Sequence, residues 1–211
     1  LALPADKIPQ FARALGAADP DAAYLQLGSQ WPHPRALLTG SRAQVLPAYQ
    51  RDPALGTTEA VMLLDQLTYL AEDILAKVDR ASMAVSLEVR VPLIDHRVVE
   101  WAWRLPRHMR HRDGTSKWLL RQVLYRHVPP SLIERPKFGF GVPVGRWLRE
   151  DLREWAEALL APQALAAAGC LNVPMIRRTW EEHRDGRRDW QHRLWTVLMF
   201  QAWRERWGAR A

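Results

Sequence analysis

The sequence predicts an all-α protein. Apolar residues recur at three- and four-residue spacing in several long stretches, which is the pattern of amphipathic helices. Capping residues and prolines separate these stretches, and no segment alternates between apolar and polar residues long enough to predict a strand. The 211 residues, 48% hydrophobic and 25% charged, exclude a disordered or collagen-like chain. They correspond to one sizeable domain, or to one domain with a tail.

Residues 1–56 are expected to form an irregular, proline-rich lead-in that contains only short helices. Proline removes a backbone donor and clashes with the preceding helical turn, so it divides this stretch into short pieces. The prolines are Pro4, Pro9, Pro20, Pro32, Pro34, Pro47 and Pro53. The second part of the expected organisation is a helical region that covers residues 57–211.

Each helix expected after residue 56 has a cap signal at its start or an apolar stripe along one face, and several end at prolines. The expected helices cover residues 57–78, 80–87, 95–104, 115–127, 146–160, 172–183 and 189–207. The predicted caps are Thr57 or Thr58, Asp95, the Thr115/Ser116 pair and Asn172. A glycine-rich loop is expected at residues 135–145, between the fourth and fifth of these helices.

The formal net charge of +7 leaves open an anionic partner such as nucleic acid. Only four of the 30 basic residues are lysine, and the arginines are spread along the chain among acids, as on solvated helix faces. Eleven tryptophans could stack on single-stranded nucleic acid, but most lie at helical spacing beside aliphatic residues, which favours core positions. A basic nucleic-acid-binding module is therefore an unfavoured alternative, as is a helical interaction domain without catalysis.

Several other classes of site are excluded or unexpected. The apolar runs, such as residues 61–64, are far shorter than the roughly 20 residues that span a membrane. Cys170 is the single cysteine, so no internal disulfide can form, and we expect a reducing, cytoplasmic compartment. The seven histidines show no metal-ligand spacing, so no metal site is expected in this chain. No Walker-type phosphate loop is present.

Two segments place ionisable residues where apolar ones would be expected. Residues 77–96 embed charges among small and apolar residues, and buried charges are tolerated only when they are paired. We expect Glu88, Arg90 and Asp95 to form an internal ion-pair network. Arg80 either joins such a network or faces a polyanionic ligand. In residues 134–143, Lys137 follows proline on a glycine-rich loop, where its point charge could stabilise negative charge developing on phosphate.

Together these segments resemble the synthetase domain of the glutamine-hydrolysing asparagine synthetase family. The resemblance covers residues 60–207 and is carried by Lys-Val-Asp-Arg-Ala-Ser-Met and Leu-Glu-Val-Arg-Val-Pro-Leu-Ile-Asp-His within residues 77–96. It is also carried by Lys-Trp-Leu-Leu-Arg at 117–121 and by Arg-Pro-Lys-Phe-Gly-Phe-Gly-Val-Pro at 135–143. The resemblance implies a helical carboxy-terminal part of a larger α/β synthetase domain of the adenine-nucleotide α-hydrolase type.

The resemblance also implies a reaction and roles for individual residues. In the family, ATP activates a carboxylate, aspartate or a related acid, as an acyl-adenylate, and ammonia derived from glutamine then forms the amide. Lys137 matches the catalytic lysine that stabilises the phosphates, and Arg80 and Asp79 match a segment that borders the substrate pocket. Lys117 and Arg121 match positions that could equally be structural, so they are not assigned to the site.

The sequence lacks other parts of the family pattern. It contains no Gly-Gly pair, and therefore no Ser-Gly-Gly-x-Asp-Ser pyrophosphate loop. It also lacks the acidic Gly-x-Gly-x-Asp-Glu loop and an amino-terminal cysteine nucleophile. We therefore interpret the chain as a carboxy-terminal part whose partners are the missing glutaminase and ATP-binding regions of the same protein. ATP and Mg²⁺ would bind mostly to those regions, and the isolated chain is expected to be inactive.

Overall fold

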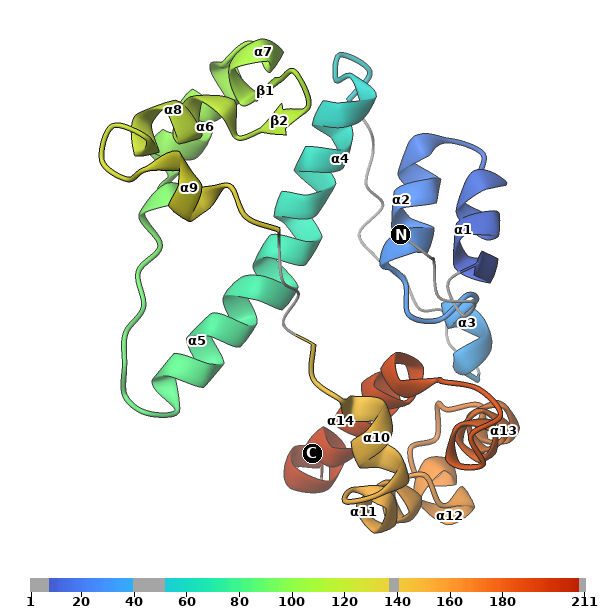
Figure 1. The fold of residues 1–211 in the computed structure, drawn as a ribbon. Helices are drawn as coiled ribbons and strands as arrows, with labels where there is room; N and C mark the ends of the chain where they lie inside the picture. The colour runs from blue at the N-terminus through green and yellow to red at the C-terminus, as the bar shows by residue number, and fades with distance from the viewer. Residues whose placement is uncertain (1–7, 40–51, 137–140, 209–211) are drawn as a thin grey trace. The chain divides into compact units, whose positions relative to one another are not determined.

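The computed structural model describes residues 8–39, 52–136 and 141–208 of a mostly helical chain (Figure 1). The chain forms two compact units. The first unit combines Leu1–Gln66 with Val142–Ala211, and the second is Leu67–Gly141. In the described ranges, β structure is limited to one pair of two-residue strands and one isolated bridge, which confirms the predicted helical class.

The carboxy-terminal part of the first unit is a bundle of helices around an apolar core. Leu148, Trp180, Leu194 and Leu198 are completely buried in it. They come from three helices, each of which presents an apolar stripe to the same interior. The helices, coloured orange to red in Figure 1, are α10 (Val144–Arg149), α11 (Arg153–Leu159), α12 (Pro162–Ala166), α13 (Val173–Arg184) and α14 (Gln191–Trp207).

The amino-terminal part of the same unit contributes short helices that lie between prolines. Asp19 caps the second of them by accepting a hydrogen bond from the backbone N–H of Ala22 at 2.7 Å. The hydroxyl of Tyr24 donates to Asp65, which joins two helices distant in sequence. These helices are α1 (Ile8–Leu15), α2 (Pro20–Gly28), α3 (Pro34–Leu37) and α4 (Thr57–Asp65).

A strap formed by residues 29–39 ties this amino-terminal part to the carboxy-terminal bundle. The indole Nε1 of the buried Trp31 lies 3.2 Å from both the backbone oxygen of Arg193 and the hydroxyl of Thr196. Further along the strap, the backbone N–H of Asn172 donates to the oxygen of Leu37 at 2.8 Å. Residues more than 130 positions apart in sequence therefore share one folded unit.

The second unit contains only one- to three-turn elements after its first helix. Its short hairpin turns at Asp113 and Gly114, both with positive φ, as a two-residue type I′ turn requires. Lys117 follows in the left-handed conformation and precedes α8. The elements are the π-helix η2 (Gln66–Leu75), α5 (Ala76–Met83), η3 (Pro92–Ile94), α6 (His96–Arg104), α7 (Arg107–Arg110), β1 (His111–Arg112), β2 (Thr115–Ser116), α8 (Trp118–Leu124) and α9 (Pro130–Ile133).

The two units differ sharply in the burial of their side chains. No described residue between Leu67 and Gly141 is buried. Large apolar side chains in that unit are exposed instead, including Val85, Leu87, Leu93 and Trp101. The first unit has a core of its own, whereas the second unit has none among its described residues.

The structure confirms some predicted helices and corrects others. Asp95 and Asn172 cap α6 and α13 as predicted, through hydrogen bonds to the backbone N–H groups of Arg97 and Met175. The separate helix predicted at residues 80–87 is wrong, because helical structure continues from α4 through η2 and α5 to Met83. The helix predicted at 146–160 is interrupted near Glu150.

Two predicted caps are also replaced by neighbouring residues. The N-cap of α4 is Gly56, so Thr57 is the first helical residue. Thr115 and Ser116 form β2, and Lys117 takes the N-cap position of α8. Within the described ranges, every helix is too short or too polar to cross a lipid bilayer.

Candidate functional site

Asp79 and Arg80, which were predicted to border a substrate pocket, lie on α5 of the second unit. Their side chains are 69% and 86% exposed, and Arg80 Nε lies 3.8 Å from Asp79 Oδ2. An ion pair at this exposure contributes little to stability. Within this chain the two residues therefore form an open polar surface, and no described residue closes a pocket over them.

The ion-pair network predicted for Glu88, Arg90 and Asp95 is not internal. Arg90 Nε does pair with Glu88 Oε1 at 2.7 Å, but both side chains are more than half exposed. Asp95 caps α6 and pairs with Arg97 Nη2 at 2.9 Å, and these contacts lower the pKa of Asp95. The prediction was wrong about burial, since the apolar residues between these charges are themselves exposed.

Lys137, the predicted catalytic residue, lies outside the described residues. The structure does describe the chain that precedes it, where Glu134 follows α9. Glu134 accepts hydrogen bonds from Arg121 of α8 and from the hydroxyl of Tyr125, which follows α8. Arg121 also donates to the backbone oxygen of Ser116 at 3.0 Å. The end of α9 is therefore bound to α8 and to the residue that follows α8.

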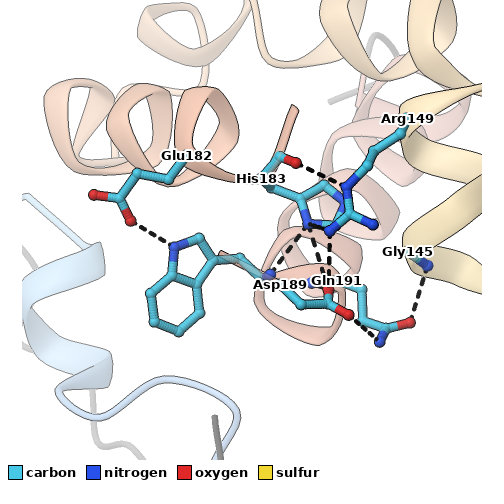
Figure 2. Close-up of polar contacts among 7 residues, drawn as sticks. Gly145, Arg149, Glu182, His183, Asp189 and Gln191 are labelled. Atoms are coloured by element: carbon cyan, nitrogen blue, oxygen red, sulfur yellow. Dashed lines mark hydrogen bonds and ion pairs between the residues drawn. The ribbon is translucent and has the colours of Figure 1, made fainter. Parts of the chain in front are cut away.

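A second polar cluster surrounds Gly145, at the downstream end of the glycine-rich segment (Figure 2). The backbone N–H of Gly145 donates to Gln191 Oε1 at 2.9 Å. Gln191 Nε2 in turn donates to Asp189 Oδ2 at 2.9 Å. A β-carbon on residue 145 would lie 3.3 Å from three oxygens of Asp189 and Gln191, so a larger residue would require these side chains to shift by a few tenths of an ångström.

His183 occupies the centre of this cluster and is completely buried (Figure 2). Its Nδ1 accepts from the backbone N–H of Trp190 at 3.1 Å and lies 3.3 Å from Arg149 Nη2. Arg149 Nε also donates to the backbone oxygen of His183 at 2.9 Å. Burial, together with the charge of Arg149, lowers the pKa of His183, although Asp189 opposes this effect. The contacts assign a neutral imidazole with its proton on Nε2.

Sequence reasoning placed His183 only at the end of a helix and missed this cluster. The available signal was local: Asp189 and Gln191 begin the last helix, and Gly145 ends a glycine-rich segment. No spacing rule joins residues 145 and 191. Nε2 of His183 has no hydrogen-bond partner within the described part of the chain. The cluster fits a structural role, because its polar groups form most of their hydrogen bonds with one another.

The described residues do not form a complete metal site by themselves. They contain no group of three or more His, Cys, Asp or Glu side chains arranged to hold a metal ion. They also do not fit an ATP site in the hollows that they line. The hollow beside α14 contains Arg204, but this guanidinium already donates to Gln201 Oε1 and to the backbone oxygen of Ala167. In the other hollow, Glu154 and Glu157 lie beside Arg153 and Arg184, so the lining offers phosphates no excess of positive charge.

Comparison with known proteins places these motifs in context. Residues 3–205 match the family described as asparagine synthase. A Mycobacterium tuberculosis protein whose name includes "asparagine synthetase [glutamine-hydrolyzing]" is 38% identical over 74% of this chain and 24% of its own length. Bacillus subtilis asparagine synthetase [glutamine-hydrolyzing] 1 is 34% identical over 66% of this chain and 22% of its own length.

The human asparagine synthetase [glutamine-hydrolyzing] is more distant, at 31% identity over 68% of this chain and 28% of its own length. The chain thus spans about a quarter of the length of the relatives that it matches. No solved structure gives a significant match.

Proposed function

Because the chain belongs to the asparagine synthase family, we propose that it is the helical carboxy-terminal part of an ATP-dependent, glutamine-hydrolysing amidotransferase. The parent enzyme would convert a carboxylate, aspartate or a related acid, to its amide. The partners of this chain would be the glutaminase and ATP-binding regions of the same protein, in the cytoplasm. Family membership does not favour the nucleic-acid-binding alternative.

The observation that carries this proposal is the set of exposed apolar residues within the family motif at residues 77–96. Val85, Leu87, Val89, Val91 and Leu93 alternate along residues 85–93, and all are exposed. Leaving five large apolar side chains of one short segment in water is unfavourable, which indicates an interaction site. In the proposed parent, the rest of the synthetase domain, an α/β fold of the adenine-nucleotide α-hydrolase type, covers this surface.

The proposed reaction uses ATP to activate the carboxylate as an acyl-adenylate, which ammonia then attacks. Lys137 would hold its ammonium close to the phosphates and stabilise their developing negative charge. Arg80 and Asp79, whose side chains are free to meet further residues, would border the substrate. The described residues contain no group of three or more metal-ligating side chains, so we place most ligands of Mg²⁺ in the rest of the parent.

The proposal is tested by pyrophosphate release in the full-length parent. Lys137→Ala is expected to lower the rate by about 10²–10³-fold, the scale for losing one preorganised stabilising donor. Lys137→Arg is expected to restore little, because a planar guanidinium does not replace a compact ammonium. Glutamine hydrolysis, measured in parallel, should fall much less. Near-normal pyrophosphate release by Lys137→Ala would remove Lys137 from the site.

The isolated chain provides a second test. Without the missing regions it should release no pyrophosphate from ATP in the presence of aspartate and ammonia, because positioning and charge stabilisation supply most catalysis at phosphate. Robust release by the 211-residue chain alone would contradict the assignment of the ATP site to the missing regions.

A further inference from the structure

Three arginines of the first unit come together without a carboxylate partner, and we propose that they bind a phosphate group. The three residues are Arg13 of α1, Arg188 in the loop before α14, and Arg193 of α14, which we call the arginine cluster. They are up to 180 positions apart in sequence, so the fold brings them together. The inference goes beyond the proposed function and does not depend on it.

Two arginines of the cluster lie over the same indole ring. Arg193 Cζ is 3.9 Å from the centroid of the Trp190 ring, and Arg188 Cζ is 5.5 Å from it. Arg193 Cζ is also 5.8 Å from the ring centroid of the buried Trp31. Aromatic faces attract cations without accepting hydrogen bonds from the edges of the guanidinium group. The rings therefore hold these two guanidinium groups in place while their N–H donors stay available.

Positive charge accumulates around Arg193. Burial is the main cause that lowers its pKa, and the charges of Arg13 and Arg188 lower it further, whereas Glu182 opposes them. A guanidinium stays protonated at neutral pH in spite of such shifts. Three like charges therefore face one another at this place, which is unfavourable unless an anion compensates them.

The carboxylates close to the cluster in sequence already have other partners. Asp185 accepts from two neighbouring arginines outside the cluster, at 2.9 and 3.1 Å. Glu182 accepts from the indole Nε1 of Trp190 at 2.7 Å, and Asp189 accepts from Gln191 Nε2 at 2.9 Å. In the described part of the chain, no carboxylate forms an ion pair with an arginine of the cluster. The compensating anion must come from outside these residues.

The cluster keeps hydrogen-bond donors for such an anion. Arg193 Nε donates to the backbone oxygen of Gln30 at 3.2 Å, and none of the described residues accepts from its two Nη atoms. The side chains of Arg13 and Arg188 donate no hydrogen bond to a described residue. Arg188 is exposed and the other two arginines are partly exposed. An anion from solvent can therefore reach all three.

The number of arginines favours phosphate over a carboxylate. A guanidinium group binds either anion through two parallel hydrogen bonds. A carboxylate has one charge and two oxygens in one plane, which a single guanidinium can satisfy. A phosphate group on an organic ligand carries about 1.5–2 negative charges at neutral pH and three acceptor oxygens. It can therefore meet several guanidinium groups, whether it is a free ion or part of a nucleotide.

A simpler role for Arg193 is to hold the strap against α14. Its contacts with Gln30 and Trp31 belong to that role, so replacing it would lower stability whether or not an anion binds. Arg188 forms no hydrogen bond, ion pair or ring contact with the strap in the described residues. Variants of Arg13 and Arg188 therefore separate anion binding from the structural role.

The experiment measures binding of inorganic phosphate to the 211-residue chain by isothermal titration calorimetry. The buffer contains about 0.1 M acetate, which competes as a carboxylate and screens charges more than about 10 Å apart. Arg13→Gln and Arg188→Gln should each weaken binding about 5- to 10-fold, the scale for losing one hydrogen bond to a charged group. Arg187→Gln removes the same charge beside the cluster, is the matched control, and should weaken binding less than about twofold.

Pyrophosphate and ADP distinguish the two sources of phosphate. Both have two phosphates, so tighter binding of ADP that weakens in Arg188→Gln identifies a nucleotide as the ligand. Equal or weaker binding of ADP identifies the free ions, and either result supports the inference. Circular dichroism of each variant verifies that it is folded.

Three results would overturn the inference. The first is the absence of saturable phosphate binding in acetate, including the case in which only an RNA oligonucleotide binds. The second is an equal loss in Arg187→Gln and Arg188→Gln, which would assign binding to overall charge. The third is full binding by the variant that combines Arg13→Gln with Arg188→Gln. None of these results affects the proposed function, whose test is pyrophosphate release by the parent.

Discussion

The two units have similar proportions of apolar residues, but the first unit buries many of them and the second buries none that the structure describes. In the carboxy-terminal bundle of the first unit, apolar side chains such as Leu198 are completely buried. In the second unit, Leu87 is 58% exposed, and no described residue is buried. Hydrophobic composition alone therefore does not show where a core forms. A core also requires elements that face the apolar side chains, and no described element buries those of the second unit.

The contrast extends to charged groups. In the first unit Arg177, 18% exposed, donates both to Glu157 and to the backbone oxygen of Leu160. In the second unit, Asp79 and Arg80 are paired at 3.8 Å but open to water. The first unit has a buried core, whereas the described family motifs of the second unit lie on an exposed surface.

Matched leucine variants give the largest expected difference between the units. In the isolated chain, Leu198→Ala should lower the free energy of unfolding by about 2–5 kcal/mol, because it leaves a cavity in the core. Leu87→Ala should change it by no more than about 0.5 kcal/mol, as for other exposed sites. Chemical denaturation followed by circular dichroism measures both. Equal losses would mean that the second unit has a core after all.

In the full-length parent, the losses of stability caused by Leu198→Ala and Leu87→Ala should differ less. If the missing regions cover residues 85–93, Leu87→Ala should lower the free energy of unfolding of the parent by about 2 kcal/mol, the scale for truncating a buried leucine. The measurement is denaturation of the parent and its variant under the same conditions. A parent as tolerant of Leu87→Ala as the isolated chain would show that this surface stays exposed.

The first unit should also respond to acid through His183. Its pKa is lowered in the folded state, so between that pKa and the ordinary value of about 6.5 the unfolded chain binds more protons. The contribution of His183 to stability is therefore complete above about pH 6.5 and is lost as the pH falls below it. The slope from one proton is at most about 1.4 kcal/mol per pH unit.

Denaturation midpoints between pH 5 and 7 provide the measurement. His183→Gln removes the titrating group, and its stability should depend less steeply on pH than that of the unaltered chain. Identical slopes in the two proteins would assign the acid sensitivity to other groups.

Helix caps give the smallest expected difference. Asn172→Ala should cost about 1–2 kcal/mol, because it removes both the cap of α13 and the donation from Nδ2 to the oxygen of Ala36 at 2.9 Å. Asn172→Asp keeps the cap and loses only the second bond, so it should cost less. Asp95→Ala removes a cap from the second unit and should barely change the unfolding of the bundle. If all three variants shifted the unfolding midpoint by the same amount, the caps of the two units would not differ in their effect on stability.

Local signals were enough to predict much of the first unit. Asn172 followed by Val173 and Pro174 predicts the start of α13, because both the cap hydrogen bond and the fixed φ of proline act within one helical turn. The interruption at Glu150 has no such signal, since it depends on how α10 and α11 pack. The cluster around His183 joins segments 46 residues apart, from Gly145 to Gln191, and no local pattern encodes it.

The second unit shows a different limit of sequence reasoning. The charges of Glu88 and Arg90 lie among apolar residues, which normally indicates burial, yet these residues are exposed here. The pattern predicts burial from the residue types alone, whereas burial also needs elements that pack over the segment, and no described residue does so. Of the predicted site residues, Asp79 and Arg80 lie together on α5, and Lys137 stays a prediction.

The strap at residues 29–39 has a consequence for how the protein is synthesised. Trp31 bonds to Arg193, 162 residues later, and the whole second unit lies between them in sequence. At translation rates of about 5–20 residues per second, Trp31 leaves the ribosome roughly 8–30 s before its partner. The tryptophan is thus left without its binding site throughout synthesis of the second unit. Ribosome-bound chains that end before residue 193 should be cleaved readily near Trp31, and protection should begin only once α14 has emerged.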